Sequence, residues 1–384
     1  MAATRDMTEA SVIRVLLVGP SMDILGGQAV QVTRLLRRLR ELEGIEVDFL
    51  AVNPRLPGPL RVLQRIKYVR TISTSIAYGL SLLTELRKHD VVHAFSASYT
   101  SYLLAPLPAM LVARLYGKRI VLNYRSGEAS DHLARSSFAV RTMHLADEIV
   151  VPSGYLVEVF AKFGLHAHSI VNFVDLDNLD YRERTVTRPR FLSNRNLEPL
   201  YNVGCTLRAF AIIQQREPDA RLTVVGDGSE RASLEALTRE LGLRNVEFAG
   251  KVPPQRMREF YDAADVYLNS PNIDNMPNSV IESFASGLPV VTTNAGGIPF
   301  IVTDGETGFM TECNDHEALA RNALALVQTP GLAQAVAARA RNVCLTRYVW
   351  EAVAVEWENL YRGLMRRNGV VPAPAAPAAL PERR

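Results

Sequence analysis

Cysteine is scarce in this 384-residue sequence, and Cys205, Cys313 and Cys344 lie far apart. Their spacing fits no metal site, and three thiols cannot all form disulfides, so a reducing, cytoplasmic compartment is expected. The histidines are isolated as well, and no Ser-His-Asp grouping is evident. We therefore expect neither a metal ion nor another cofactor.

Long hydrophobic runs are also missing. No stretch of about 18 uninterrupted apolar residues is present, so no transmembrane helix is expected. The first twelve residues, MAATRDMTEASV, are polar and include acidic side chains, which does not fit a signal peptide. Hydrophobic residues still make up 48% of the chain, enough for two domains of ordinary size.

Neither sign of charge dominates the whole chain, but its two parts differ. Residues 1–172 carry 20 lysines and arginines against 14 acidic residues, whereas the remainder carries 23 against 26. A basic first part suggests an anionic partner, such as a membrane surface or a phosphorylated acceptor, although scattered surface charge explains it equally well. No binding to nucleic acid is expected.

Strands and helices alternate through the first part. Val12–Gly19 is a nearly continuous apolar run, as buried parallel strands are, and an amphipathic helix follows it. The further predicted strands are Val47–Val52, Val91–Phe95, Ile120–Tyr124 and Ile149–Pro152, and the further predicted helices are Tyr102–Tyr116 and Tyr155–Lys162. This alternation predicts a parallel, doubly wound α/β sheet.

The pattern breaks over residues 173–189, which are polar and irregular and form an interdomain linker in this interpretation. Alternation then resumes, with strands at Arg190–Asn194, Leu222–Val225, Val246–Ala249, Val266–Asn269 and Val290–Thr292. The sequence therefore predicts two domains, residues 1–172 and 190–348, with a small-molecule site in the cleft between them. The Pro- and Ala-rich tail, residues 370–384, is expected to be disordered.

The most informative stretch is residues 265–299, ADVYLNSPNIDNMPNSVIESFASGLPVVTTNAGGIP. A strand leads into a loop that carries Asp274, and a short helix over Pro277–Ser286 carries Glu282. In an open α/β sheet both carboxylates lie at the carboxyl edge of the strands, where such sheets bind ligands. A carboxylate there can accept hydrogen bonds from two vicinal hydroxyls of a ribose or a hexose.

This stretch resembles the acidic signature of the retaining, nucleotide-sugar-dependent glycosyltransferases of the GT-B fold, family 4 type. The matching positions are Glu282, Gly287, Pro289, Val290, Val291, Gly296, Gly297 and Pro299. The resemblance extends over nearly the whole chain and is strongest over residues 195–310. It implies two Rossmann-like domains and a final helix, residues 349–365, that crosses back to pack on the first domain.

The resemblance also implies a donor site on the second domain. Glu282 would bind the ribose hydroxyls, Asp274 would lie near the sugar and diphosphate, and Arg195 would bind phosphate through two parallel hydrogen bonds. Further donor-site candidates are Gly226, Asp227, Gly228, Val252, Asn275, Asn278 and Ser279. From the first domain, Gly26 and Gly27 offer backbone N–H groups to phosphate, unless they form a plain tight turn.

Three positions depart from the family pattern. Asp274 stands where the family usually has Glu, Leu200 where it has Lys, and Arg125 where many members have His. Arg125 joins Asp274, Glu282 and Arg195 as a catalytic candidate, since it can partly replace the missing lysine, although a surface arginine is an equal interpretation. The candidates on the acceptor side are His93, Glu128, Asp131 and His132.

A basic, amphipathic segment spans residues 55–83. No acidic residue occurs there before Glu85, and apolar residues recur at helical spacing at Val62, Ile66, Val69, Ile76, Leu80 and Leu83. Such a helix can lie on an anionic membrane, where a lipid-linked acceptor would be found. A stripe of this length packs more often into a domain core, and both interpretations stay open.

The predicted function is retaining transfer of a hexose-type sugar from a UDP- or GDP-linked donor to a glycan or lipid-linked acceptor. Polysaccharide or glycoconjugate synthesis, in the cytoplasm or at the inner face of the membrane, is the expected setting. The alternatives are an inactive nucleotide-sugar-binding relative, suggested by the three departures, and a GT-B nucleotide-sugar epimerase. A dinucleotide oxidoreductase is excluded, because no G-x-G-x-x-G with a following acid comes after the first strand.

Overall fold

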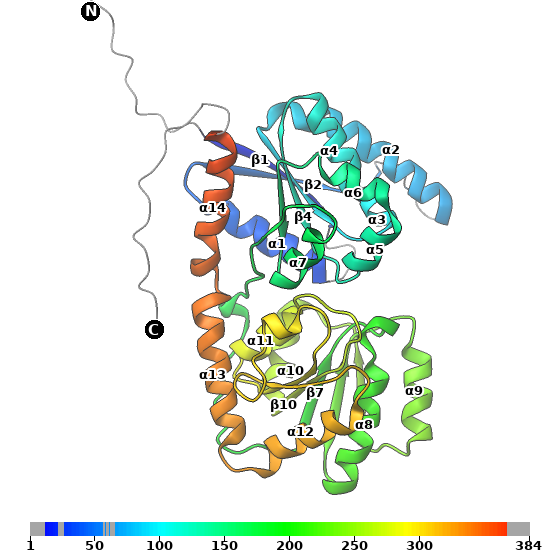
Figure 1. Ribbon diagram of the computed structural model, residues 1–384. Coiled ribbons are helices and arrows are strands. Elements are labelled where there is room, and N and C mark those ends of the chain that lie inside the picture. The colour runs from blue at the N-terminus through cyan, green and yellow to red at the C-terminus, as the bar shows by residue number, and fades with distance from the viewer. Residues whose placement is uncertain (1–11, 22–26, 57, 59–60, 62–65, 367–384) are drawn as a thin grey trace, which may run out of the picture.

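The computed structural model describes residues 12–21, 27–56, 58, 61 and 66–366. Gly26 and the tail 370–384 lie outside the described residues. The chain forms two α/β domains, one above the other in Figure 1, and the predicted GT-B architecture is confirmed. Among the described helices, none combines the length and the apolar character needed to cross a membrane.

The N-terminal domain is built on a six-stranded parallel sheet of order β2-β1-β3-β4-β5-β6. Its strands are β1 (Ile13–Gly19), β2 (Ile45–Ala51), β3 (Val91–Ser96), β4 (Arg119–Tyr124), β5 (Glu148–Val151) and β6 (His168–Ser169). Its helices are α1 (Gly27–Leu39), α2 (Lys67–Glu85), α3 (Thr100–Leu104), α4 (Pro106–Leu115), α5 (Ala129–Arg135), α6 (Ser137–Met143) and α7 (Gly154–Ala161), with a 3₁₀ turn at Leu86–Lys88. The predicted helix Tyr102–Tyr116 is two helices, because Pro106 has no N–H to continue the first and instead begins the second.

The C-terminal domain repeats the plan, with a parallel sheet of order β12-β11-β10-β7-β8-β9. Its strands are β7 (Arg190–Asn194), β8 (Arg221–Val225), β9 (Val246–Gly250), β10 (Val266–Asn269), β11 (Val290–Thr293) and β12 (Phe309–Thr311). Its helices are α8 (Val203–Arg216), α9 (Arg231–Glu240), α10 (Met257–Ala263), α11 (Asn278–Ala285), α12 (His316–Gln328) and α13 (Leu332–Arg347), with 3₁₀ turns at Leu176–Asn178, Pro199–Tyr201, Pro254–Arg256 and Ile298–Phe300. The short edge strands β6 and β12 were not predicted.

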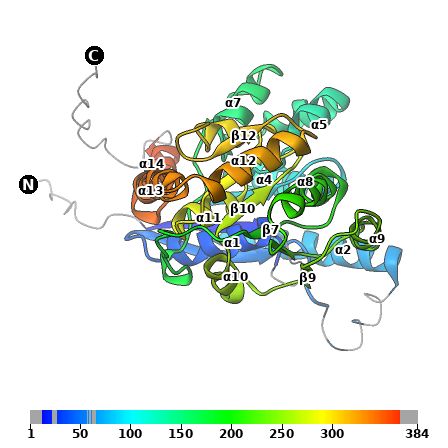
Figure 2. The ribbon, with the colours of Figure 1, turned by 90° about the horizontal axis from the view of Figure 1, so that it is seen from below.

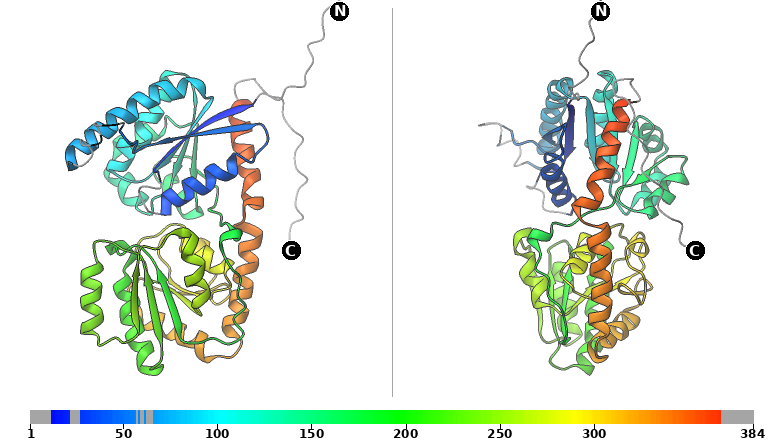
Figure 3. Two further views of the ribbon diagram at one scale, coloured as in Figure 1. Left: turned by 180° about the vertical axis from the view of Figure 1, so that it is seen from behind. Right: turned by 90° about the vertical axis from the view of Figure 1, so that its left-hand side faces the viewer.

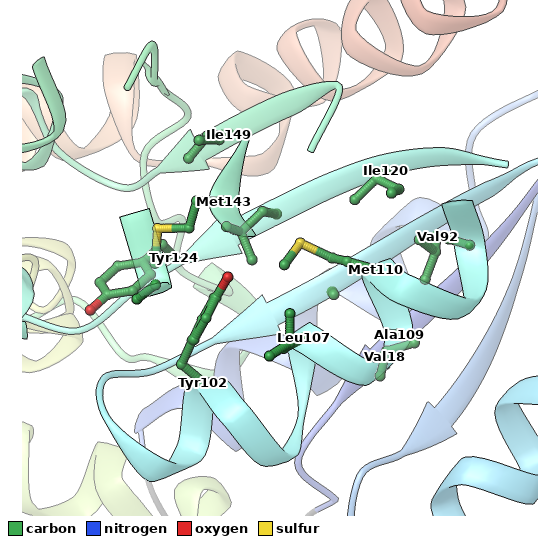
Figure 4. Packing of buried hydrophobic residues seen from close by; sticks show 14 of the residues in the cluster. Val18, Val92, Tyr102, Leu107, Ala109, Met110, Ile120, Tyr124, Met143 and Ile149 are labelled. Carbon is green, nitrogen blue, oxygen red and sulfur yellow. The ribbon is translucent and has the colours of Figure 1, made fainter. Parts of the chain in front are cut away.

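Each sheet has an apolar cluster on both faces, which explains why its strands read as continuous hydrophobic runs. Figure 4 shows one cluster, in which Val92 of β3 and Ile120 of β4 lie against Leu107 and Met110 of α4. Helices on both faces of a parallel sheet are the doubly wound arrangement that the sequence predicts.

The last helix, α14 (Trp350–Arg366), crosses back to the N-terminal domain, as the resemblance implied. Figure 3 shows it continuing upward from α13 along one side of both domains. Its buried Trp357 and Tyr361 join the cluster formed by β1 and β2. This helix ties the two domains together at one end of the cleft.

The strand orders define where a ligand site belongs. In the first sheet the chain order reverses between β1 and β3, and in the second between β7 and β10. Open α/β sheets bind ligands outside the carboxyl ends of the strands at such switch points. Residues that follow these strands line one cleft between the domains.

Candidate active site

The interdomain cleft has a volume of about 730 Å³, a size that suits a small-molecule ligand. Its N-terminal wall carries Gly27, Arg34 and Arg125, and its C-terminal wall carries Arg195, Gly226, Val252, Asp274, Asn275, Asn278, Ser279 and Glu282. Nine of the twelve predicted donor-site residues therefore line one cleft, whereas Asp227 and Gly228 do not and Gly26 lies outside the described residues.

Asp274 and Arg195 form an ion pair at the second switch point. Arg195 Nη2 donates to Asp274 Oδ2 at 2.6 Å, and the Asn275 backbone N–H donates to the other carboxylate oxygen at 2.9 Å. Both side chains are about nine-tenths buried, at 9% and 11% exposure. Burial raises the pKa of Asp274, and the neighbouring Arg195 charge counteracts only part of that effect. The pair is thus a desolvated charge couple on the cleft wall.

Further contacts orient the Arg195 guanidinium. It lies over the Tyr201 ring, 4.0 Å from the centroid, and its Nη1 donates to Ser279 Oγ at 3.4 Å. Its Nε is buried without a hydrogen-bond partner among the described residues. The packing holds the planar group in a fixed orientation, which is the arrangement that two-point recognition of phosphate requires.

Glu282 lies in the second turn of α11. Pro277 is the N-cap of that helix rather than part of its first turn, and Gly287 takes the left-handed conformation (φ 67°) just after its end. Glu282 accepts hydrogen bonds from Arg34 Nη2 at 3.1 Å and from the Tyr261 hydroxyl at 2.9 Å. The carboxylate that the resemblance assigns to ribose is thus held by an arginine of the opposite domain.

The double glycine Gly296-Gly297 packs against the acidic loop. A Cβ atom at Gly296 would overlap the carbonyl oxygen of Asp274, and one at Gly297 would overlap that of Asn275. Gly127, from the N-terminal domain, lies against the same Asp274 backbone. Bare backbone is therefore needed here to position Asp274.

In the Gly226-Asp227-Gly228 turn, glycine is likewise needed for close contact with a neighbouring backbone. A Cβ atom at Gly226 (φ 134°) would overlap the carbonyl oxygen of Arg195, and one at Gly228 would overlap that of Leu197. The Leu197 N–H donates to the Asp227 carbonyl at 3.1 Å. Of the three turn residues, Gly226 lines the cleft, and the turn supports the loop that carries Arg195.

The N-terminal domain contributes the start of α1. Gly27 and Gln28 line the cleft there, so the positive end of a 13-residue helix points into it. From the same helix, Gln31 Nε2 donates to Asn278 Oδ1 at 2.6 Å. Ser153, which caps α7, donates to Asn275 Oδ1. Asn275 and Asn278, like Glu282, are therefore already in contact with residues of the opposite domain.

Arg125 reaches the cleft, but protein groups hold its guanidinium. Its Nε donates to Asn123 Oδ1 at 2.8 Å, its Nη1 donates to Asn172 Oδ1, and its charge lies 5.1 Å from the Phe95 ring centroid. Burial lowers its pKa to about 9. Its role as a phosphate ligand stays a prediction.

Two of the acceptor-side candidates are buried. His93 lies wholly inside the domain, where its Nδ1 pairs with the Tyr361 hydroxyl at 2.6 Å and its Nε2 accepts from Asn123 at 2.8 Å. His132 pairs with the Tyr124 hydroxyl at 2.9 Å and is 2% exposed. Burial lowers the pKa of both imidazoles. The structure does not bring either ring to the surface of the cleft.

Glu128 and Asp131 line a second hollow of about 450 Å³, on the other side of Asp274. Tyr99 is part of the same hollow and donates to Asp131, which also pairs with Arg135 at 2.8 Å. The Asp131 carboxylate raises the pKa of Tyr99 to about 12. Tyr99 has a positive φ of 55°, which a non-glycine residue rarely adopts and which often marks a functional site.

Sequence reasoning missed Arg34, Tyr261, Tyr201 and Tyr99. Arg34 belongs to a helix whose polar face carries several arginines, and no local signal separates it from Arg37 or Arg38. The contact with Glu282 joins residues 248 positions apart. Only the relative placement of the two domains selects it.

Comparison with known proteins supports this description. The sequence model of Glycosyltransferase Family 4 matches residues 25–178, and that of Glycosyl transferases group 1 matches residues 181–343. The N-acetyl-alpha-D-glucosaminyl L-malate synthase of Bacillus anthracis is 28% identical over 90% of this chain and 97% of its own length. The sulfoquinovosyl transferase of Arabidopsis thaliana is 25% identical over 76% of this chain, which spans 60% of that relative.

Solved structures agree on the fold. Sucrose-phosphate synthase from Thermosynechococcus elongatus superposes with a TM-score of 0.72 at 18% identity, covering 92% of this chain and 100% of that chain. The structure of Anabaena HepE in complex with UDP and glucose superposes with a TM-score of 0.70 at 17% identity, covering 91% of this chain and 99% of that chain. With both halves matched by family models and the fold shared, the chain belongs to the glycosyltransferases of the group 1 and family 4 type.

Proposed function

We propose that this glycosyltransferase moves a hexose-type sugar, with retention of configuration, from a nucleoside diphosphate sugar to a glycan or lipid-linked acceptor. The observation that carries the proposal is the joint placement of Arg195, Asp274 and Glu282 on one wall of the cleft, at a switch point. An arginine for phosphate and carboxylates for hydroxyls are the groups that such a donor needs. HepE, whose fold is similar, is seen with UDP and glucose, which favours UDP over GDP.

Each of these cleft residues has its own role in the proposed reaction. Glu282 accepts hydrogen bonds from the ribose hydroxyls once Arg34 yields its place, and Asp274 orients a hydroxyl of the transferred sugar. Arg195 and the amides at the start of α1 stabilise the diphosphate as the bond from its oxygen to the anomeric carbon breaks. The acceptor oxygen bonds to that carbon from the same face, and its proton passes to the departing diphosphate. The protein mainly positions the reactants and excludes water.

The second hollow is the proposed entry for the acceptor. It shares Gly127, Glu128, Ile273 and Asp274 with the main cleft, so a ligand there lies next to the sugar site. Glu128 and Asp131 can accept hydrogen bonds from acceptor hydroxyls. Synthesis of a polysaccharide or glycoconjugate on the cytoplasmic side fits such an acceptor.

Calorimetric titration with UDP, GDP and ADP and their sugars tests donor binding. We expect UDP to bind, and Glu282→Gln to weaken it by about tenfold or more, because hydrogen bonds to a charged group contribute about 1.5–3 kcal/mol. Glu358→Gln, which removes an exposed carboxylate paired with Arg362 on α14, is the matched control. Absence of binding by every nucleotide, or equal affinity in both variants, would contradict the proposed site.

Product analysis tests the reaction itself. Transfer to an added acceptor with an unchanged anomeric configuration, seen by proton NMR, is the expected result. Binding of the donor without transfer or hydrolysis would favour the inactive relative. A changed sugar on free nucleotide, without acceptor, would favour the epimerase.

A further inference from the structure

Helix α2 leaves one apolar stripe uncovered. Ile72, Ile76, Leu80 and Leu83 follow each other at spacings of four, four and three residues, and are 63%, 59%, 61% and 39% exposed. Ile66, just before the helix, is 57% exposed. Of the described members of the stripe predicted from the sequence, Ile66, Ile76, Leu80 and Leu83 are exposed and Val69 is half-buried, and none of them belongs to the apolar clusters of the domain.

A different face of α2 anchors the helix to the domain. Tyr78 and Leu82 are fully buried, and the Tyr78 hydroxyl donates to the carbonyl oxygen of Ala105 at 2.7 Å. The exposed stripe is thus a second apolar face on a helix that is already held. Packing of α2 onto the domain core therefore does not explain why the exposed stripe is apolar.

The neighbouring helices α3 and α4 also carry exposed leucines. Leu111 and Leu115 of α4 are 52% and 73% exposed, and Leu103 and Leu104 of α3 are 44% and 41% exposed. The Tyr116 hydroxyl, directly after α4, donates to the carbonyl oxygen of Leu83 at 3.2 Å, so α2 and α4 lie against each other. We call these exposed aliphatic residues of α2, α3 and α4 the α2–α4 surface. Aliphatic exposure on adjacent helices indicates an interaction site rather than scattered surface residues.

The charge of the same elements is strongly positive. Residues 66–88 and 100–118 contain six lysines and arginines and a single acidic residue, Glu85. Glu85 is itself paired with Lys88 at 2.9 Å. An apolar helix face bordered by cations is the chemistry that binds an anionic lipid interface. Two copies of so basic a surface would repel each other, which disfavours a dimer through this face.

The position of α2 suits a surface-bound enzyme. Figures 1 and 3 show α2 projecting from the side of the N-terminal domain opposite α14. Figure 2, from below, shows the same outward position. The helix follows β2, whose carboxyl end lies at the edge of the sheet that borders the cleft. A membrane on this surface would lie on the side of the N-terminal domain away from α14.

We propose that the α2–α4 surface docks this protein on an anionic membrane, with the aliphatic stripe in the interface and the basic residues at the lipid headgroups. Docking depends on the surface alone and not on the proposed sugar transfer. If it holds together with that function, it makes the acceptor a lipid-linked molecule.

Co-sedimentation of the full chain with phosphatidylcholine vesicles, with and without phosphatidylglycerol, tests the proposal. We expect binding to the anionic vesicles that weakens as salt is raised. The triple variant Ile72→Gln, Ile76→Gln, Leu80→Gln should lose at least about tenfold in partitioning, because three aliphatic side chains no longer enter the interface. The matched control is Val186→Gln, Leu345→Gln, Val355→Gln, which changes three exposed aliphatic residues elsewhere and should bind as the parent does.

Thermal melts and UDP titration show whether each variant remains folded. An unchanged melt and unchanged UDP affinity, together with lost vesicle binding, support the proposal without reference to transfer activity. Three results would overturn it: no binding to anionic vesicles, equal loss in the two triple variants, or a vesicle-free dimer that the α2 variant dissociates.

Discussion

At the residue scale, the site depends on glycines as much as on charges. The backbone of Asp274 and Asn275 is enclosed by Gly296 and Gly297 of the same domain and by Gly127 of the other. Any side chain at these contacts would move the loop that holds the Asp274 carboxylate against Arg195. Glycine is thus required here for packing, and the packing fixes the carboxylate at the proposed donor site.

Gly296→Ala is expected to destabilise the protein more than an alanine substitution at a positive-φ glycine with open space around it. Its matched control is Gly305→Ala, since Gly305 has a φ of 72° against 52° at Gly296 but open space around its Cβ position. The control should cost about 1–2 kcal/mol of stability for the left-handed conformation alone. Gly296→Ala should cost more and also weaken UDP binding, as measured by denaturant unfolding and calorimetry. Equal effects of the two changes would argue against the enclosed loop.

At the element scale, the return of α14 determines the environment of β3. His93 of β3 stacks on Trp357 of α14 at 5.0 Å and pairs with Tyr361. Burial, and then the Arg125 charge, lower the pKa of His93 well below its usual 6.5. The folded protein therefore keeps this ring neutral at pH values where the unfolded chain takes up a proton.

This difference predicts a pH dependence of stability. Stability is fully present above pH 6.5 and falls as the pH drops below it, by about 1.4 kcal/mol per pH unit from His93 alone. His93→Gln, which does not titrate, should make the decline shallower between pH 6.5 and 5, as measured by urea unfolding. His144→Gln, at an exposed histidine, is the control for the loss of one imidazole. An identical slope in His93→Gln would contradict a neutral buried ring.

At the scale of the whole molecule, the two domains are held together across the cleft by polar contacts. Arg34 pairs with Glu282 at 3.1 Å, and Gln31 donates to Asn278 at 2.6 Å, both between α1 and α11. Arg34 also donates to the Phe173 carbonyl at 2.7 Å. Because Glu282 is the proposed ribose ligand, closure without nucleotide and binding of nucleotide use the same carboxylate.

Arg34→Ala should shift the unliganded protein toward a more open form. Hydrogen bonds to charged groups contribute about 1.5–3 kcal/mol, so the closed population should fall by about tenfold relative to the open one. Small-angle X-ray scattering would show this as a larger radius of gyration. Arg231→Ala, which breaks an ion pair within α9, is the control and should leave the curve unchanged. Superimposable scattering curves for the parent and both variants would contradict a role of the Arg34–Glu282 contact in holding the domains closed.

Local sequence was enough to predict both sheets except their short edge strands β6 and β12, and to predict the charged residues on the C-terminal wall of the cleft. Strand-like runs repeat with helices between them, and strand order follows from short right-handed connections. Asp274, Glu282 and Arg195 could be predicted because each lies directly after a strand or in the helix that follows one, so the sheet edge gathers them. The position of each of these residues is therefore set by the strand that precedes it in the chain.

Only the tertiary structure shows which residues form the N-terminal wall of the cleft and which apolar residues remain exposed. His93 is buried by a helix residue 268 positions away, and Arg34 meets Glu282 only because α1 and α11 face each other. Periodicity shows that the apolar residues of α2 share a face, but what covers a face depends on elements distant in the chain. The sequence by itself determined the two domains and the sheet edge at which the proposed donor residues lie, whereas long-range packing decided which side chains complete the cleft and which remain exposed.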